Sequence, residues 1–314
     1  MLTLFAVPKH FKGHFNIIQR NAIQSWMSLK SSCEIILFGD EEGTAEVAEE
    51  YGARHCPEIA RNEFGTPLLN DIFEKAQHLS TNKFFCFINA DIILLSDFPK
   101  ALNNISFHRF LLAGQRWDMH IDHPLDFHDA AWETKLRYRL GKDAVLHTPD
   151  GIDYFVFSHG LWGKIPPFAI GRPAYDNWLI YRARARRAAV IDATPVITAI
   201  HQNHDYSHAP NGWQTVWEGP ECVRNKALAG CKDRWFTLWD ANWLLTDQGV
   251  QRSQRPEHLQ RLEGKWKILH PRLHACKEAL KAPFFFPRRV LGALFRRAKR
   301  YVSTAPKEND TSGA

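Results

Sequence analysis

Short apolar runs alternate with helix-like segments through the first half of the chain. Residues 2–7 (LTLFAV), 34–38 (EIILF) and 84–88 (FFCFI) have the length and composition of buried strands. Residues 14–30 and 66–79 place apolar side chains at helical spacing, and the second segment begins with Thr-Pro, a helix-start signal. Strands and helices that alternate in this way form βαβ units. The pattern therefore predicts an α/β fold with a mostly parallel central sheet flanked by helices.

The second half of the chain continues with shorter strands and longer loops. Residues 111–118 (LLAGQRWD) and 153–162 (DYFVFSHGLW) predict strands with their exits. Residues 130–140 and 177–188 (NWLIYRARARRA) predict helices, and residues 190–201 (VIDATPVITAIH) predict one or two strands that end in a histidine. The second half therefore differs in character from the regular alternation of the first half.

The composition changes toward the carboxyl end, where polar and basic residues replace the apolar runs. We divide the chain into a folded domain (1–245), a helical or linker extension (246–283), and a basic amphipathic helix with a hydrophilic tail (284–314). No internal repeat is found.

Overall composition places the chain among ordinary globular proteins, since 45% of its 314 residues are hydrophobic and 24% are charged. The formal net charge of +6 favours anionic partners such as phosphates or lipid headgroups. The six cysteines are scattered without a C-x-x-C pair, as suits a reducing compartment. We see no basic segment followed by an apolar one at the start, and no apolar run of the roughly 18 residues that span a membrane. We therefore expect a cytoplasmic protein without a signal peptide.

Polar residues close several of the predicted strands, at the edge where open α/β sheets bind their ligands. Asp40 follows one such strand, Asn89 and Asp91 follow another, and His201 ends a third. Each residue alone is more often a turn or cap residue, so their order along the chain is the informative feature. No GxGxxG follows the first strand and no GxxxxGK[ST] occurs, which disfavours a dinucleotide-binding domain and a P-loop ATPase.

In that order the chain resembles the GT-A glycosyltransferases, close to the inverting family 2 type of the nucleotide-diphospho-sugar transferases. Such enzymes commonly have a strand ending in an acid, an Asn-bearing helix, and a strand ending in Asp-x-Asp. Here the matching residues are Asp40, Asn70 and Asn89-Ala90-Asp91. Later positions of the family are an acidic pair that opens an Arg-bearing helix and a strand ending in His, which correspond here to Tyr175-Asp176 and His201.

The resemblance implies a site for a nucleotide-sugar and a divalent cation. Asp91 and His201 would be the metal ligands, and Asp40, Asn70 and Asn89 would contact the nucleotide together with Asp91. A hard cation needs only one or two protein groups when phosphates and waters complete its shell, so Mn²⁺ or Mg²⁺ is expected. A histidine ligand favours Mn²⁺. Asn89 replaces the first acid of Asp-x-Asp and removes one negative charge from this site.

The general base for inverting transfer is predicted to be Asp176, at the start of a helix. Asp153 is the reserve candidate and more plausibly binds the acceptor. Trp162 and Trp178 are further acceptor-binding candidates because indole rings stack on sugar faces. Acceptor choice is expected to depend on the loops at 115–129 and 207–220.

Two aromatic or histidine patterns have other interpretations. His201, His204 and His208 could form a zinc site on a helix, although Pro210 follows closely and no HExxH is present. A second pattern lies further on, where three tryptophans stand four residues apart and predict a packing stripe on one helical face: Trp235, Trp239 and Trp243.

The carboxyl-terminal segment 284–302 (FFFPRRVLGALFRRAKRYV) contains no acidic residue. On a helical wheel its apolar side chains gather on one side and its arginines on the other. A basic amphipathic helix of this kind is typical of a membrane-surface anchor. We expect peripheral contact with the inner face of the plasma membrane and no binding of nucleic acid, because the basic residues are concentrated in this tail.

The sequence therefore favours a glycosyltransferase that moves a sugar from a nucleotide-diphosphate-sugar to a glycan or lipid-linked acceptor. Two alternatives remain open. One is a retaining transferase on the same fold, in which Asp176 would not act as base. The other is a catalytically inactive glycan-binding or scaffold protein, favoured by the non-acidic residues Asn89 and Tyr175 at positions where the family is usually acidic.

Overall fold

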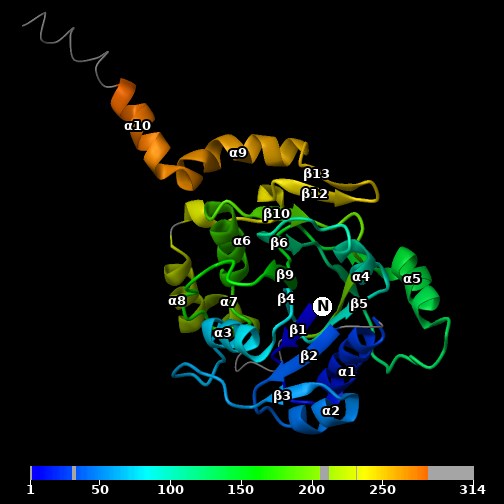
Figure 1. Ribbon diagram of the computed structural model, residues 1–314. Coiled ribbons are helices and arrows are strands. Elements are labelled where there is room, and N and C mark those ends of the chain that lie inside the picture. Colours follow the sequence, from blue (N-terminus) through cyan, green and yellow to red (C-terminus); the bar gives the residue numbers. More distant parts are fainter. Residues whose placement is uncertain (1, 30–32, 206–211, 231, 282–314) are drawn as a thin grey trace, which may run out of the picture. The chain divides into compact units, whose positions relative to one another are not determined.

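The structure is a computed structural model that describes residues 2–29, 33–205, 212–230 and 232–281 (Figure 1). Its described residues divide into two compact units, one that extends to Glu263 and one that begins at Gly264. The predicted carboxyl-terminal helix at 284–302 and His208 of the possible zinc motif lie outside the described residues.

A nine-stranded sheet forms the centre of the first unit (Figure 1). The strands lie in the order β13-β12-β10-β6-β9-β4-β1-β2-β3. Their bounds are β1 Leu2–Ala6, β2 Cys33–Phe38, β3 Arg54–Cys56, β4 Phe84–Ile88, β6 Phe110–Ala113, β9 Tyr154–Ser158, β10 Ala189–Asp192, β12 Trp243–Thr246 and β13 Gly249–Arg252.

Most neighbouring strands in this sheet are parallel, which confirms the predicted α/β fold. β1 is parallel to β2 and β4, β2 to β3, and β10 to β6 and β12. β9 is antiparallel to both of its neighbours, β4 and β6, and the edge hairpin β12–β13 is antiparallel as well. Because β9 runs opposite to β4, its first residue, Tyr154, pairs with the last residue of β4, Ile88. Asp153 therefore lies at the edge of the sheet where β4 ends.

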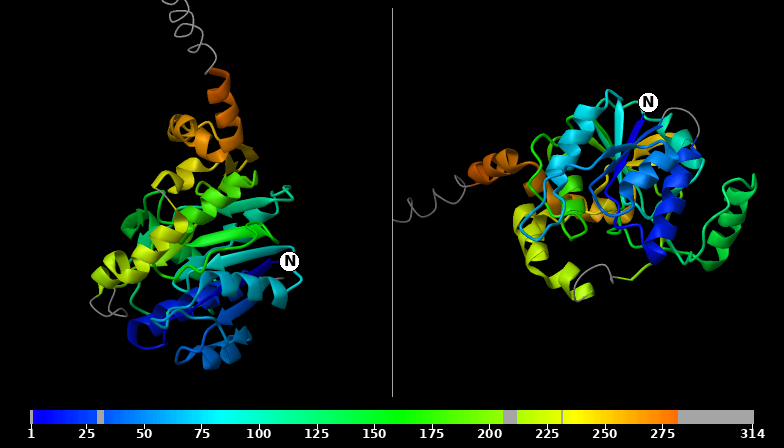
Figure 2. Two further views of the ribbon diagram at one scale, coloured as in Figure 1. Left: turned by 90° about the vertical axis from the view of Figure 1, so that its left-hand side faces the viewer. Right: turned by 90° about the horizontal axis from the view of Figure 1, so that it is seen from below.

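Helices cover both faces of the central sheet (Figure 1 and Figure 2). Alternate residues of β1 point to opposite faces, so Leu4 packs in one apolar cluster with Trp26 and Phe98, which belong to α1 and α4. Phe5 points the other way, and its ring centroid lies 5.2 Å from that of Phe73 on α3. The helices that pack against the sheet are α1 Gly13–Met27, α2 Thr44–Tyr51, α3 Leu69–Leu79, α4 Asp97–Leu102 and α6 Tyr175–Ala185.

A second, four-stranded sheet lies beside the end of β4, in the order β5-β11-β7-β8. Its strands are β5 Ile92–Leu94, β7 Trp117–Met119, β8 Val145–Leu146 and β11 Ala199–Gln202. β11 pairs antiparallel with β5 and parallel with β7, and the register places His201 opposite Ile92 on one side and Asp118 on the other. This small sheet brings distant parts of the sequence to Asp91, which lies in the turn between β4 and β5.

The remaining helices are α5 Trp132–Asp143, α7 Trp213–Glu218, α8 Pro220–Ala229, α9 Pro256–Leu269 and α10 Pro271–Lys281, with 3-10 turns η1 Lys232–Arg234 and η2 Leu238–Asp240. α7 lies inside the segment 207–220 that the sequence predicts as a loop. Among the helices that the structure describes, none has both the length and the apolar character needed to cross a membrane.

Two sequence-based predictions of elements are wrong. The helix expected from residue 66 begins at Leu69, because Pro67 and Leu68 are extended and bridge to Arg61 and Ala169. The expected helical stripe of tryptophans does not exist, since η2 contains one of the three and Trp243 opens strand β12.

Candidate functional site

A cavity of about 430 Å³ lies at the carboxyl end of β4. The residues that line it come from the turn after β4, the start of β9, the first turn of α6 and the segment around the end of β11. This is the edge at which open α/β sheets place their ligands. Five of the residues predicted for the site line it together: Asn89, Asp91, Asp153, Asp176 and His201.

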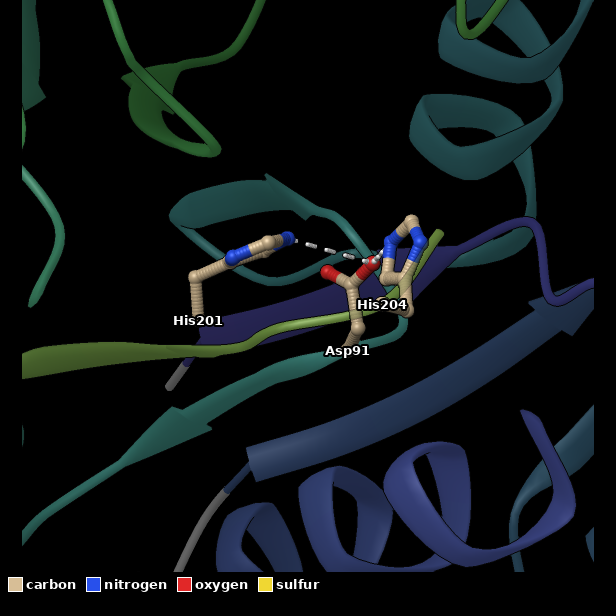
Figure 3. Close-up of side chains that lie close together, drawn as sticks. All are labelled: Asp91, His201 and His204. Carbon is tan, nitrogen blue, oxygen red and sulfur yellow. Dashed lines mark hydrogen bonds and ion pairs between the residues drawn. The ribbon is translucent and has the colours of Figure 1, made fainter. Parts of the chain in front are cut away.

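Asp91 occupies the centre of a cluster with two histidines (Figure 3). Its Oδ2 atom lies 3.0 Å from Nε2 of His204 and 3.9 Å from Nε2 of His201. Its other oxygen, Oδ1, is buried and has no hydrogen-bond partner among the described residues. A buried carboxylate oxygen without a partner is costly, so the arrangement is suited to a ligand that would bind it.

The second nitrogen of each histidine ring is directed at another oxygen atom. Nδ1 of His201 lies 3.2 Å from Oδ1 of Asp118, its cross-strand neighbour on β7, without the geometry of a hydrogen bond. Nδ1 of His204 lies 2.7 Å from the backbone carbonyl oxygen of Asp205. Histidines that bind metals commonly have their other nitrogen held by a hydrogen bond, as His204 has, which leaves Nε2 available as a ligand atom.

The cluster fits a divalent metal ion. One ligand atom from each of Asp91, His201 and His204 can be chosen so that all lie within 4.8 Å of one another. Burial alone would raise the pKa of Asp91, but the hydrogen bond with His204 and the nearby charges of His201 and Lys9 lower that pKa below its ordinary value. Asp91 is therefore ionised, as a metal ligand must be.

Asp118 and Arg116 connect this cluster to the rest of the cavity. Arg116 donates from Nε to Asp118 at 2.9 Å and from Nη1 to Asp153. Asp118 also lies 2.6 Å from Nδ1 of His147. Burial would raise the pKa of Asp118, whereas His201, Arg116 and His147 together lower it well below its ordinary value. The carboxylate beside His201 is thus a fixed negative charge.

Asn89 and Asp153 form a pair at the junction of β4 and β9. The Asn89 side chain donates to Asp153 Oδ1 at 2.5 Å, and the Asn89 backbone donates to the Asp153 carbonyl at 2.9 Å. An acid at position 89 could not donate this side-chain hydrogen bond while ionised. The structure therefore gives a physical reason for an amide at this position, because it neighbours a carboxylate.

Asp176 lies in the first turn of α6, with one carboxylate oxygen 2.9 Å from the backbone nitrogen of Asn177. Burial, with a contribution from the negative charge of Asp153, raises its pKa to about 7. Ala174, at the N-cap of the helix, has φ of 90°, a conformation that costs a non-glycine residue energy and is often found near functional sites. A carboxylate with this pKa can accept a proton near neutral pH.

Two cationic side chains also line the cavity. The Lys9 ammonium lies 4.6 Å from the centroid of the Phe15 ring and makes no hydrogen bond or ion pair with the described residues. Burial lowers the pKa of Lys9, partly opposed by Asp91. Arg172 is paired with Glu221, at 2.6 Å between Nη2 and Oε2. Lys9 is thus placed to attract an anionic ligand such as a phosphate.

Other residues predicted for the site lie outside this cavity. Asp40 is 70% exposed, is paired with Arg61 at 2.5 Å, and lines a different cavity of about 630 Å³. Asn70 lies on α3, and its buried Oδ1 has no hydrogen-bond partner among the described residues. Trp162 and Trp178 are only 2% and 6% exposed and pack in the core, so their ring faces are not presented to the cavity.

Four residues of the site were missed by the sequence analysis or named only in another context. His204 was grouped with His201 as a polar cluster after a predicted strand and in the zinc motif, but it was not predicted as a ligand beside Asp91; Lys9, Arg116 and Asp118 were not considered. Asp118 could have been predicted as a site residue, because it is an acidic residue that follows an apolar run of strand character. Its partner His201 lies on a strand far along the chain, and no local pattern joins the two.

A scan against protein-family models and a search of curated proteins find no match to this chain. Solved structures with a similar fold include S. aureus TarS 1–349 in complex with UDP-GlcNAc, with 13% identity, a TM-score of 0.43, and coverage of 67% of this chain and 61% of that one. A further TarS structure has 10% identity, a TM-score of 0.43, and coverage of 64% of this chain and 36% of that one. The chain therefore spans less than two thirds of these TarS chains.

A second group of similar structures is glucosyl-3-phosphoglycerate synthase from Mycobacterium tuberculosis. Its complex with Mn²⁺, UDP and phosphoglyceric acid has 14% identity, a TM-score of 0.43, and coverage of 73% of this chain and 78% of that one. At these identities, and with TM-scores below 0.5, the likeness assigns no activity to this chain.

Proposed function

We propose that the protein is an inverting glycosyltransferase that uses a nucleotide-diphosphate-sugar as donor and a glycan or lipid-linked acceptor. The observation that supports this most directly is that one cavity contains both the Asp91–His201–His204 cluster and Asp176. The first is suited to a cation that binds a diphosphate, and the second to a base that activates a hydroxyl group. Asn89, Asp91 and Lys9 are proposed to contact the donor.

Asp91, His201 and His204 would hold Mn²⁺ in preference to Mg²⁺, because imidazole nitrogen suits Mn²⁺ better. A bound cation would neutralise the charge that develops on the diphosphate as the sugar leaves. Lys9 adds a positive charge at the same cavity. Asp118 would place a negative charge 3.2 Å from Nδ1 of His201, beside the metal ligands.

Asp176 would take the proton from the acceptor hydroxyl group. As that proton moves to the carboxylate, a bond forms between the acceptor oxygen and the anomeric carbon of the sugar. The bond from that carbon to the diphosphate oxygen breaks, and the nucleoside diphosphate leaves with the electron pair. Attack from the face opposite the leaving group inverts the anomeric configuration. Analysis of the product anomer would distinguish this reaction from a retaining transfer.

The assignments of Asp40 and Asn70 to nucleotide binding remain proposals, as do the domain boundaries at residues 245 and 283. We also propose that segment 284–302 contacts the inner face of the plasma membrane from the cytoplasm. Its basic residues support this, since each lysine or arginine near an anionic leaflet contributes about 1 kcal/mol of attraction.

The test is thermal unfolding of the full chain with a panel of nucleoside diphosphates, in Mn²⁺ and in EDTA. One nucleotide is expected to raise the midpoint by several degrees, because a ligand at about 100 times its dissociation constant adds about 2.7 kcal/mol of stability. Asp91→Ala should abolish the shift. Asp143→Ala, which changes an exposed aspartate on α5, is the matched control and should retain it.

The possible outcomes have distinct meanings. A thermal shift that persists in EDTA and in Asp91→Ala would support the proposed nucleotide site but contradict the proposed role of the metal. The absence of a shift with every nucleotide would contradict the proposed function and favour an inactive, glycan-binding protein.

A further inference from the structure

Helix α7 presents two stacked indole rings to solvent. Trp213 is 50% exposed and Trp217 is 41% exposed. Their ring centroids are 6.5 Å apart, and the ring planes differ by only 21°. The two residues are one helical turn apart, so the helix itself holds the rings nearly parallel.

The same side of α7 carries polar groups beside the two rings. Residues at 213, 214, 217 and 218 occupy about 140° of the helix circumference, and all four are exposed. Val216 is the buried residue of the helix and also lines the cavity. The exposed side therefore combines two indoles with the amide of Gln214 and the carboxylate of Glu218.

This aromatic surface adjoins the candidate active site. Trp217 lines the cavity that also contains Asp91 and Asp176. A ligand in contact with Trp217 can therefore extend into the cavity where the candidate base lies. By contrast, the tryptophans that the sequence suggested for acceptor binding, Trp162 and Trp178, are buried in the core.

Close contacts fix α7 relative to its neighbours. The thiol of Cys222 on α8 donates to the Trp217 carbonyl oxygen at 2.8 Å. A Cβ atom at Gly219, between the two helices, would lie 2.3 Å from the Thr215 carbonyl oxygen, so only glycine permits this approach. Asn225 of α8 is buried and exchanges two hydrogen bonds of 2.9 Å with the backbone of Ala169.

The segment around Ala169 leads directly to the first turn of α6. Arg172 lies on this segment and pairs with Glu221 of α8. The connection runs from α7 through α8 to the segment that ends at Asp176. These contacts link α7 through α8 to the segment that precedes the candidate base.

We propose that Trp213 and Trp217 form a binding platform for a sugar ring of the acceptor, which makes the acceptor a glycan. The inference rests on the proposed function, because it assigns this ligand to the acceptor side of the same cavity. The apolar face of a pyranose stacks on an indole, and its hydroxyl groups bond to amides and carboxylates such as those of Gln214 and Glu218. A glycan fits better than an anionic membrane, since Glu218 would be repelled by the lipid headgroups.

The test is binding of the full chain to an array of immobilised oligosaccharides, without nucleotide and without metal. We expect at least one class of oligosaccharide to bind the wild-type protein. Trp213→Ala and Trp217→Ala should each weaken that binding about tenfold, and Trp217→Tyr should restore most of it, because a tyrosine ring also stacks on sugars. Trp239→Ala is the matched control, since Trp239 is 37% exposed and does not line the cavity.

Nucleotide-dependent thermal shifts of the same variants separate the two proposals. The platform is supported when the alanine variants lose glycan binding and retain the shift with the nucleotide. It is overturned when no oligosaccharide binds, when the alanine variants bind as tightly as the wild type, or when Trp239→Ala weakens binding equally. It is also overturned when the alanine variants keep their glycan binding and instead lose binding to anionic vesicles.

Discussion

At the scale of single residues, the most informative side chain is Asp176, because its surroundings alter its acid–base properties. Burial and the neighbouring Asp153 raise its pKa to about 7. An ordinary aspartate is a weak base at neutral pH, whereas one with this pKa can both accept and release a proton there. The position of this residue at the start of a helix is fixed by the left-handed conformation of Ala174.

Replacing Asp176 by asparagine should reduce turnover by about 10²- to 10⁴-fold, the usual contribution of a general base. The amide is close to isosteric, so nucleotide-dependent stabilisation should be retained. Steady-state transfer rates measured with the donor and acceptor would test this, with Asp143→Asn as the control. Normal turnover in Asp176→Asn would contradict the assignment.

The pH dependence of the same reaction should follow the protonation of Asp176. Below pH 7 the carboxyl group gains its proton and can no longer accept one, so kcat/KM should fall as the pH decreases through about 7. In Asp176→Asn the residual rate should lack this step. A wild-type profile that shows no change between pH 5 and pH 8, where only the imidazole groups and perturbed acids titrate, would contradict the role of this residue.

Some residues of the candidate site could be predicted from the sequence and others could not, for physical reasons. Asp91 and Asp176 could be predicted because each follows or opens a regular element, where a polar side chain at a fixed offset is visible in the chain. His204 lies outside a strand and reaches Asp91 across 113 positions of sequence. Asp118 contacts His201 only because of the register between β7 and β11, which no local pattern specifies.

At the scale of elements, α8 connects the exposed α7 to the segment before α6. The side chains that α8 buries against its neighbours include the polar residues Glu221 and Asn225. Asn225 is fully buried and donates to the carbonyl oxygens of Ala169 and Arg172 while accepting from the Ala169 backbone. These hydrogen bonds satisfy both backbone polar groups of Ala169 and the carbonyl group of Arg172.

Asn225→Ala should therefore destabilise the protein by about 2 kcal/mol, because it leaves buried backbone groups without hydrogen bonds. Chemical denaturation monitored by circular dichroism would measure the change. Asn104→Ala, at an exposed position, should change stability by less than about 0.5 kcal/mol. Equal stability of Asn225→Ala and the wild type would show that α8 is not held by these bonds.

Element types were predictable where a segment supplies its own periodicity. The strand FFCFI and the helix of residues 177–188 are examples, since their patterns are complete within each segment. The start of α3 was misplaced because Pro67 and Leu68 bridge to Arg61 and Ala169. The tryptophans at 235–243 have helical spacing, yet pairing with β10 and β13 draws the last of them into a strand.

At the scale of the whole molecule, the chain separates into a unit that contains the cavity and a second unit from Gly264 onward. Removal of residues 284–314 should leave the thermal unfolding midpoint and its response to nucleotides unchanged. The same truncation should abolish sedimentation with vesicles that contain anionic phospholipid, because it removes the basic segment. Vesicle binding that survives the truncation would assign membrane contact to another part of the chain.

The order of strands in the central sheet has a consequence for synthesis on the ribosome. β1, β2, β3 and β4 are neighbours in the sheet and consecutive in the chain, so they can pair as soon as they emerge. β6 emerges next, but both of its neighbours, β9 and β10, are still to be made. The apolar strand FLLA must therefore remain unpaired while more than forty further residues are added, roughly 2 to 9 seconds at ordinary elongation rates. During that interval the nascent chain presents an incomplete sheet edge, the stage at which we expect a chaperone to be most useful.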